Sequence, residues 1–325
     1  MNTLTVFIIA VTTSRMIFPG VPPVLPAPDA PKLTSPPAAR TISFDLFSGA
    51  KATYLSKVEV QVPEGLKVAN PVRLILDLER KSLSEPEQQA SSSKFVVKQY
   101  WGSAEEVPAG QPRVYMSDQL PVVESPRSLP DTSYAYWPAS TAEPLAEDAS
   151  AVGTYVLTSD YCGRAQITLD SLYDFLAPID LVGTPRKADL DKPVKITWKS
   201  VPRALGYLVT AVGGSSAESI TWTSSSDPAL AETLEHRPWT REEIADLIEK
   251  KVLLPSYCVS CTIPAGIFKG SSSVFVSIMA FGPDKIEKQD GFETWVIVRS
   301  KAGIPIFGTN YKPMIEDENK KGPAG

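Results

Sequence analysis

The feature that most constrains the fold is an alternation of apolar and polar residues within positions 189–214. Val194, Ile196 and Trp198 are separated by lysine and threonine, and a polar break then leads into a second apolar run that starts at Tyr207. Successive side chains of a strand point to opposite faces of a sheet, so the pattern predicts two strands, each with one buried face.

The same alternation recurs in the first half of the chain. Residues 56–62 and 72–78 each alternate, residues 94–101 are predicted as the next strand, and residues 152–157 and 165–169 predict a hairpin closed across 159–164. Short alternating strands separated by turn residues are typical of antiparallel β-sandwiches.

Two helices are predicted inside the second half. Asp227 followed by Pro228 is a typical helix start, and Thr240 with Glu243 three residues later forms a capping box. The later segment 274–281 is apolar at both its odd and its even positions. A strand of this kind must be buried on both faces of its sheet, and the inserted helices can pack against one of them.

The predicted fold is therefore mainly β, with two β-sandwich domains of the immunoglobulin or fibronectin type III kind and a boundary within residues 172–189. The expected divisions are an apolar N-terminal segment at 1–17, a proline-rich linker at 18–39, a first sandwich at 40–180, a second sandwich at 181–308 with a helical insertion at 227–254, and a disordered tail at 309–325.

The N-terminal segment suggests export. Leu4–Val11 is apolar and has the length of a signal-peptide core, although no Lys or Arg precedes it. It is too short to span a bilayer, which takes about 20 apolar residues. With the proline-rich stretch that follows, it predicts an extracytoplasmic protein without a transmembrane span.

Charge argues against a nucleic-acid partner. The formal net charge is −5, and no run of basic residues is longer than two. Binding to phosphates needs a dense field of Lys and Arg.

Residues 190–300 resemble a fibronectin type III domain. The resemblance rests on VKITW ending at Trp198, a turn containing proline, GYLVTA beginning at Gly206, CTIPAG, and the strand SIMAFGPD. It implies that Trp198 and Tyr207 lie in a core between two sheets. The insertion at 227–254 and the missing tyrosine of the penultimate strand depart from the family, which serves mostly for interaction and spacing.

Few residues suggest chemistry. His236 is the only histidine and stands apart from any nucleophile motif, so a surface histidine is expected. Cys258 and Cys261 form a CxxC that leads into a strand-like segment, which favours a packed or locally bridged pair over a redox or zinc site. Ser91–Lys94 matches SxxK without the companion motifs of penicillin-recognising enzymes.

Two aromatic groups are the candidate binding residues. Tyr100 and Trp101 form one group, and Tyr134, Tyr136 and Trp137 form the other. Exposed rings can stack on sugars or anchor a protein, but rings of this kind also fill sandwich cores.

The expected function is a non-catalytic, exported interaction or structural module of a cell envelope, with a protein or glycan partner and neither cofactor nor metal. The alternatives are a carbohydrate-binding module that uses the aromatic groups, and a hydrolase with carboxylates on loops.

Overall fold

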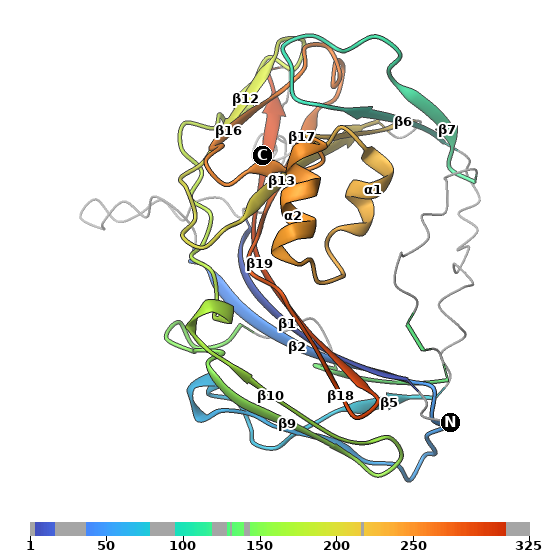
Figure 1. The fold of residues 1–325 in the computed structure, drawn as a ribbon. Helices are drawn as coiled ribbons and strands as arrows, with labels where there is room; N and C mark the ends of the chain where they lie inside the picture. The colour runs from blue at the N-terminus through green and yellow to red at the C-terminus, as the bar shows by residue number, and fades with distance from the viewer. Residues whose placement is uncertain are drawn as a thin grey trace, which may run out of the picture.

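The protein is mainly β, as predicted, with two helices against one face of a long sheet (Figure 1). The structure is a computed structural model, and it describes residues 4–16, 37–78, 95–118, 129–130, 132–139, 144–215 and 218–309. Most of the proline-rich segment, the SxxK motif and all but Thr309 of the C-terminal tail lie outside these residues.

The elements are, in chain order, β1 (Thr5–Met16), β2 (Ala39–Ser48), β3 (Val58–Gln61), β4 (Val72–Arg73), β5 (Ile75–Asp77), β6 (Val96–Trp101), β7 (Arg113–Met116), β8 (Ser133–Trp137), β9 (Gly153–Ser159), β10 (Gly163–Leu169), β11 (Lys187–Ala188), β12 (Val194–Thr197), β13 (Gly206–Gly214), β14 (Glu218–Thr223), α1 (Pro228–Thr233), α2 (Arg241–Glu249), β15 (Leu254–Pro255), β16 (Ser260–Ile263), β17 (Ser273–Phe281), β18 (Lys285–Gln289) and β19 (Phe292–Gly308). Short 3-10 turns lie at Glu64–Leu66 and Ser171–Tyr173.

The described residues form three sheets. The largest has 13 strands and the order β5-β8-β2-β1-β19-β17-β13-β14-β6-β7, with β11, β15 and β18 attached at its sides. The others are a four-stranded sheet, β10-β9-β3-β4, and the pair β12-β16. The predicted hairpin of the first half is confirmed as β9 and β10.

The N-terminal apolar segment is a central strand of the large sheet. β1 runs parallel to β19 from Thr5 opposite Phe292 to Met16 opposite Gly303, and antiparallel to β2 on its other side. Its apolar composition is explained by burial on both faces, since Phe7, Ile9 and Val11 are buried on one face and Val6 and Ile8 on the other. Most of the segment expected at 1–17 thus forms a strand of the fold, and export stays a prediction.

The large sheet also crosses the boundary expected at 172–189. β6, from the first half, pairs in parallel with β14, from the second half. β19 is 17 residues long and extends from one end of the molecule to the other (Figure 1). It pairs with β1 of the first half and with β17 of the second half.

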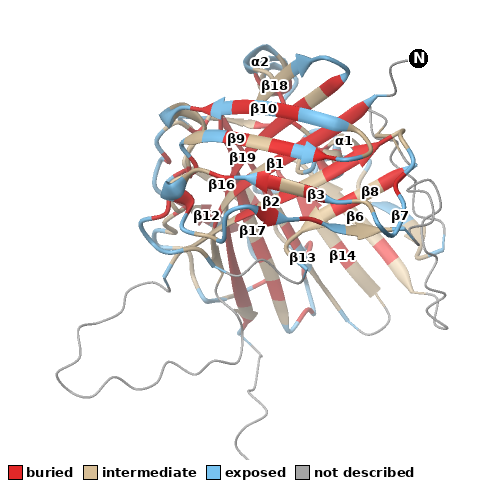
Figure 2. Ribbon diagram, turned by 90° about the horizontal axis from the view of Figure 1, so that it is seen from below, coloured by how far each residue is buried: buried red, intermediate tan, exposed pale blue. Residues whose placement is uncertain are grey.

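One hydrophobic core joins the three sheets. Both smaller sheets contribute to the same cluster of buried residues as one face of the large sheet, here called the core face. Its members include Val60 of β3, Leu157 of β9, Ile196 of β12, Ile263 of β16 and Val298 of β19. Figure 2 shows buried residues along strands throughout the interior.

The helices cover part of the opposite face of the large sheet, called the helix face. Leu234, Trp239, Ile244 and Leu247 pack there with strand residues that include Phe281. This confirms that the apolar strand β17 has cover on both sides. The group is called the helix cluster.

Both predicted helix starts are confirmed. The Asp227 side chain accepts from the N–H groups of Ala229 and Leu230, and Thr240 and Glu243 form the reciprocal capping box. The second helix ends before the predicted insertion at 227–254 does: α2 ends at Glu249, and Lys251 has a positive φ of 59° that a continuing helix cannot adopt.

Two strand predictions differ in detail. Residues 72–78 form two short strands in different sheets, β4 and β5, because Leu74 between them donates its N–H to Val58. The sequence predicts a closing strand only over Thr294–Val298, whereas the final strand in the structure extends from Phe292 to Gly308.

Trp198 occupies the predicted position between sheets. It is 2% exposed, and its ring lies 5.3 Å from that of Tyr207 on β13. The Tyr207 hydroxyl accepts the N–H of Val201, which fixes the turn between the two rings. Lys195 and Lys199 are exposed and Thr197 is half-buried.

Candidate functional site

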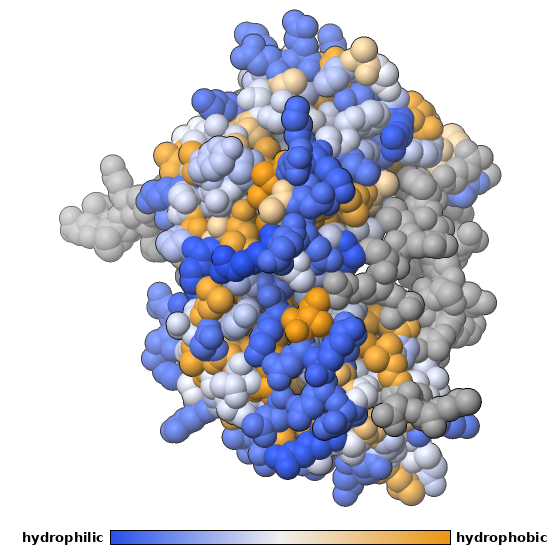
Figure 3. All heavy atoms as spheres, viewed as in Figure 1, coloured by the Kyte–Doolittle hydropathy of each residue, from blue (hydrophilic) through white to orange (hydrophobic). Residues whose placement is uncertain are grey.

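A pocket of about 470 Å³ lies on the helix face of the large sheet. Its lining residues are Ile8, Ala10, Thr12, Ser43, Asp45, Phe47, Leu129, Glu235, His236, Ile297, Arg299 and Lys301. Pockets of this size, partly apolar with a few polar groups, are typical binding sites for small molecules. Figure 3 shows one side of the molecule, where hydrophobic residues form separate patches among hydrophilic ones.

The floor of the pocket follows from strand parity. β2, β1 and β19 are neighbours, and every second residue of each strand points to the same face. The registers place Ala10 between Ser43 of β2 and Ile297 of β19, and this row lies at the centre of the floor.

One end of the pocket is apolar. Val6, Ile8, Phe47, Trp295 and Ile297 form a buried cluster on the helix face, with Leu129 packed against it. This group is called the apolar cluster.

The other end is charged because the segment between α1 and α2 is fastened to β19. Lys301 forms an ion pair with Glu235, and the Arg299 guanidinium donates to the carbonyl of Arg237 at 2.9 Å. These two contacts hold Glu235 and His236 beside the sheet.

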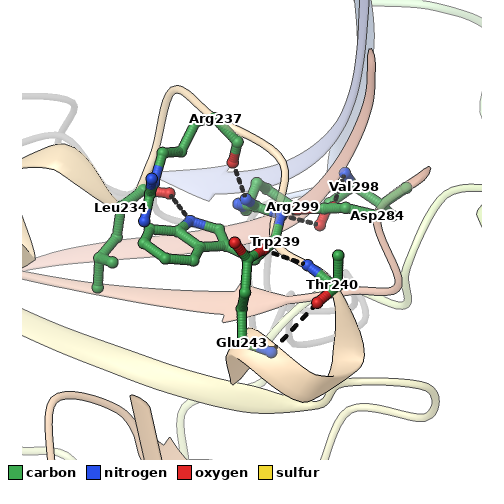
Figure 4. A network of polar contacts seen from close by, with 8 residues as sticks. All are labelled: Leu234, Arg237, Trp239, Thr240, Glu243, Asp284, Val298 and Arg299. Carbon is green, nitrogen blue, oxygen red and sulfur yellow. Dashed lines mark hydrogen bonds and ion pairs between the residues drawn. The ribbon is translucent and has the colours of Figure 1, made fainter. Parts of the chain in front are cut away.

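Arg299 is itself fixed by a buried carboxylate (Figure 4). Its Nη1 lies 2.7 Å from Asp284 Oδ1, and the two side chains are 2% and 1% exposed. Asp284 also accepts the backbone N–H groups of Val298 and Trp239. Burial raises the pKa of Asp284, while Arg299 and these two N–H groups oppose that shift.

The charged end retains unused hydrogen-bond donors. Arg299 Nε is buried and has no hydrogen-bond partner in the part of the chain that the structure describes. A lysine ammonium carries three donors, and Glu235 uses one of those on Lys301. His236 adds an exposed imidazole.

Glu235 is held in its ionised form. Burial acts to raise its pKa, but the hydrogen bond and charge of Lys301, with the charges of His236 and Arg299, lower the pKa below its ordinary value of 4.5. A lowered pKa in the folded state stabilises the fold above the unfolded pKa, and that stability is lost as pH falls through the folded pKa.

We therefore expect the Glu235→Gln variant to lose part of the acid sensitivity of the wild type. Wild type and variant should differ most in melting temperature at neutral pH and converge as pH falls below the ordinary glutamate pKa of 4.5. Thermal unfolding across a pH series measures this. A constant difference down to the lowest pH would assign the effect to something other than ionisation.

The aromatic candidates from the sequence do not form one site. Tyr134 and Tyr136 stack with ring centroids 5.4 Å apart, and they share the helix face with Phe47, since Phe47 is the register partner of Tyr134. The Tyr134 hydroxyl donates to Asp45 at 2.6 Å, so it adjoins the pocket. Trp137 points to the core face, 5.7 Å from the ring of Phe44.

The other aromatic group lies on β6, near the opposite edge of the large sheet. Tyr100 is half-buried and packs against the main core. Trp101, also half-buried, is covered by the guanidinium of Arg113 at 4.9 Å. Together with Trp137, these two rings mainly serve packing.

All three cysteines are free thiols. Cys258 is half-buried and its Sγ donates to the carbonyl of Ser260 at 3.1 Å. Burial, with a smaller contribution from Cys258, raises the pKa of Cys261. A raised pKa leaves little thiolate at neutral pH, whereas a redox pair needs a lowered one.

We expect no catalytic turnover from this CxxC in an insulin-reduction assay. The matched control is the Cys258→Ser, Cys261→Ser double variant, which should give the same background rate. A rate for the wild type clearly above that of the double variant would contradict this expectation.

Sequence reasoning missed the pocket, although a signal was present. Charged residues interrupt two otherwise apolar strands: Asp45 in β2, and Arg299 and Lys301 in β19. All three occupy the alternate positions whose side chains point to the helix face. Without knowing that β1 joins β2 to β19, the three strands could not be combined into one surface.

Other features that would suggest a function are limited. Among the described residues, no three or more His, Cys, Asp or Glu side chains cluster as metal ligands would. In the same ranges, neither helix is long and apolar enough to cross a membrane. The chain matches no known protein-family profile and no curated protein.

Proposed function

We propose that this protein is a non-catalytic binding module whose ligand occupies the pocket over β2, β1 and β19. The observation that carries the proposal is that the charged lining is preformed. Arg299 pairs with Asp284, Lys301 with Glu235, and Asp45 accepts from Tyr134. Side chains fixed by one another favour recognition, because little conformational entropy remains to be lost on binding.

A titration with small fragments tests this proposal. Two-dimensional amide NMR spectra would be recorded with carboxylates, amines, alcohols and sugars added separately. We expect shifts at residues that line the pocket for at least one class. The Ala10→Phe variant should lose them, because the added ring fills the centre of the floor.

Val212→Phe is the matched control. Val212 is an apolar residue of β13, 49% exposed and distant from the pocket lining, so the new ring should fit without closing the pocket. Shifts that survive in Ala10→Phe, or an absence of shifts with every class in the wild type, would overturn the proposal.

Carbohydrate binding is a second candidate, favoured by the stacked pair Tyr134 and Tyr136 beside Asp45. Aromatic rings next to a carboxylate are suited to sugar faces and hydroxyls. A glycan array distinguishes it: bound glycans that are lost with Tyr136→Ala would favour this candidate.

Hydrolysis is a third candidate, because Asp45 and Glu235 line the same pocket. A glycosidase needs one carboxyl group with a raised pKa as its general acid. The lowered pKa of Glu235 does not fit that role. Turnover of aryl glycosides that Glu235→Gln and Asp45→Asn each abolish would nevertheless support hydrolysis.

The proposed interaction role also agrees with the resemblance to fibronectin type III domains. Support comes from the layer of β12 and β16 facing β13, with Trp198 and Tyr207 in contact between them. Fold alone does not determine function, so the pocket remains the main argument.

We further propose an extracytoplasmic location in the cell envelope, now on the proline-rich segment alone, because Leu4–Val11 belongs to the sheet. Fractionation of cells that express the chain, followed by immunodetection, tests this location.

A further inference from the structure

We infer that the ligand of the pocket is an amphiphilic monocarboxylate, with its carboxylate at Arg299 and Lys301 and its apolar part over Ile8 and Ile297. This inference rests on the proposed binding function and names the class of ligand. Its basis is the distribution of lining residues between the two ends of one pocket.

The end of the pocket at Ile8 is mainly apolar and fits a hydrocarbon, and the one carboxylate there, Asp45 opposite Ile8, is occupied by the hydroxyl of Tyr134. Ile8, Phe47 and Ile297 belong to the apolar cluster, and Leu129 packs against them. Ala10 at the centre of the floor contributes only a methyl group, which leaves room along the strands. Transfer of apolar ligand surface from water to this end provides the main driving force.

The charged end of the pocket fits a carboxylate because two cationic side chains of the same strand line it. Arg299 and Lys301 are two residues apart on β19 and therefore point to the same face. Arg299 is 2% exposed, and its Nε has no partner among the described residues. Lys301 retains two donors that Glu235 does not use, and these can bind a ligand oxygen beside the positive charge of Arg299.

A monoanion fits better than a dianion. The charge of Arg299 is balanced by Asp284 and that of Lys301 by Glu235, and Asp45 adds one further negative charge to the pocket lining. A dianionic phosphate would meet two carboxylates without a surplus of positive charge. A single carboxylate can instead be held mainly by hydrogen bonds from Arg299, Lys301 and His236.

Isothermal titration calorimetry with four probes tests this assignment. The probes are sodium decanoate, decanol, sodium acetate and decyltrimethylammonium, each kept below its micelle concentration. We expect decanoate to bind at least about tenfold more tightly than decanol or the cationic amphiphile. Acetate, which lacks the apolar part, should give no measurable heat.

Two variants locate the two ends of the ligand. Ala10→Phe should abolish decanoate binding, and Lys301→Gln should weaken it at least about tenfold while leaving the weaker binding of decanol unchanged. Lys269→Gln is the matched control, since it removes another lysine that pairs with a carboxylate, Asp191, outside the pocket. Each variant's melting curve checks that it is folded.

Equal affinity for decanoate and decanol would overturn the role of the carboxylate. Tighter binding of decyltrimethylammonium would reverse the sign of the preferred charge. If fragments of another class bind in the NMR titration while decanoate does not, the ligand class is wrong but the proposed binding function stands. If no probe binds in either experiment, both fail.

Discussion

Replacing Ile9 with Asp is expected to unfold the protein at ambient temperature. Ile9 lies in the middle of β1, is 0% exposed and belongs to the main core. An unpaired carboxylate buried there costs about 4 kcal/mol or more. That cost is a large share of the roughly 5–15 kcal/mol by which proteins are stable.

The comparison variant is Leu4→Asp. Leu4 immediately precedes β1 and is 47% exposed, so the same substitution should change stability by less than about 0.5 kcal/mol. Circular dichroism and urea unfolding of both variants measure the difference. A stable Ile9→Asp protein would show that β1 is dispensable and would favour the interpretation of this segment as a removable leader.

Truncating Trp198 to Ala is expected to cost about 3–5 kcal/mol, because it removes a large buried ring and leaves a cavity. The ring is 2% exposed and packs against Tyr207, which joins β12 of the small sheet to β13 of the large one. The turn through Val201, which depends on the Tyr207 hydroxyl, should loosen as well.

The manner of unfolding distinguishes two organisations. Two independent sandwiches would lose the second domain and retain the first. The structure instead predicts one shifted transition for the whole chain, since β1 and β19 pair along their length and one core connects all three sheets. Scanning calorimetry of Trp198→Ala tests this, and two separated transitions with only one displaced would contradict it.

Much of the local structure could be predicted from the sequence. Alternation identified β3, β9, β10 and β12, because period two directly reports a strand with distinct faces. The helix caps at Asp227 and Thr240 could also be predicted, because each capping side chain accepts hydrogen bonds from backbone N–H groups only two or three residues away in the sequence.

The arrangement of the strands could not be predicted in the same way. The pairing of β1 with β19 joins the two ends of the chain, and that of β6 with β14 joins its two halves. Such contacts depend on which surfaces fit together in three dimensions, and no local pattern records them. An apolar run such as Leu4–Val11 has the same composition whether it is exported or buried.

The five aromatic candidates lie at different places in the fold. Tyr134 and Tyr136 lie beside the pocket, whereas Tyr100 and Trp137 pack against the core and Trp101 lies under Arg113. The presence of an aromatic residue does not show whether its ring packs in the core or lines a binding site, because aromatic residues in both roles favour the same positions in strands. His236 lines the pocket for a reason absent from the sequence, which is the attachment of its segment to β19.

The most direct test of the binding site is a crystal structure of the protein with ω-bromodecanoate, in which the anomalous signal of bromine locates the apolar end of the ligand. The structure predicts the bromine peak beside Ile8 and Phe47, and carboxylate density within hydrogen-bond distance of Arg299 and Lys301. A bromine peak at Trp101 or elsewhere on the surface, with the pocket empty, would contradict the assignment of the pocket as the binding site.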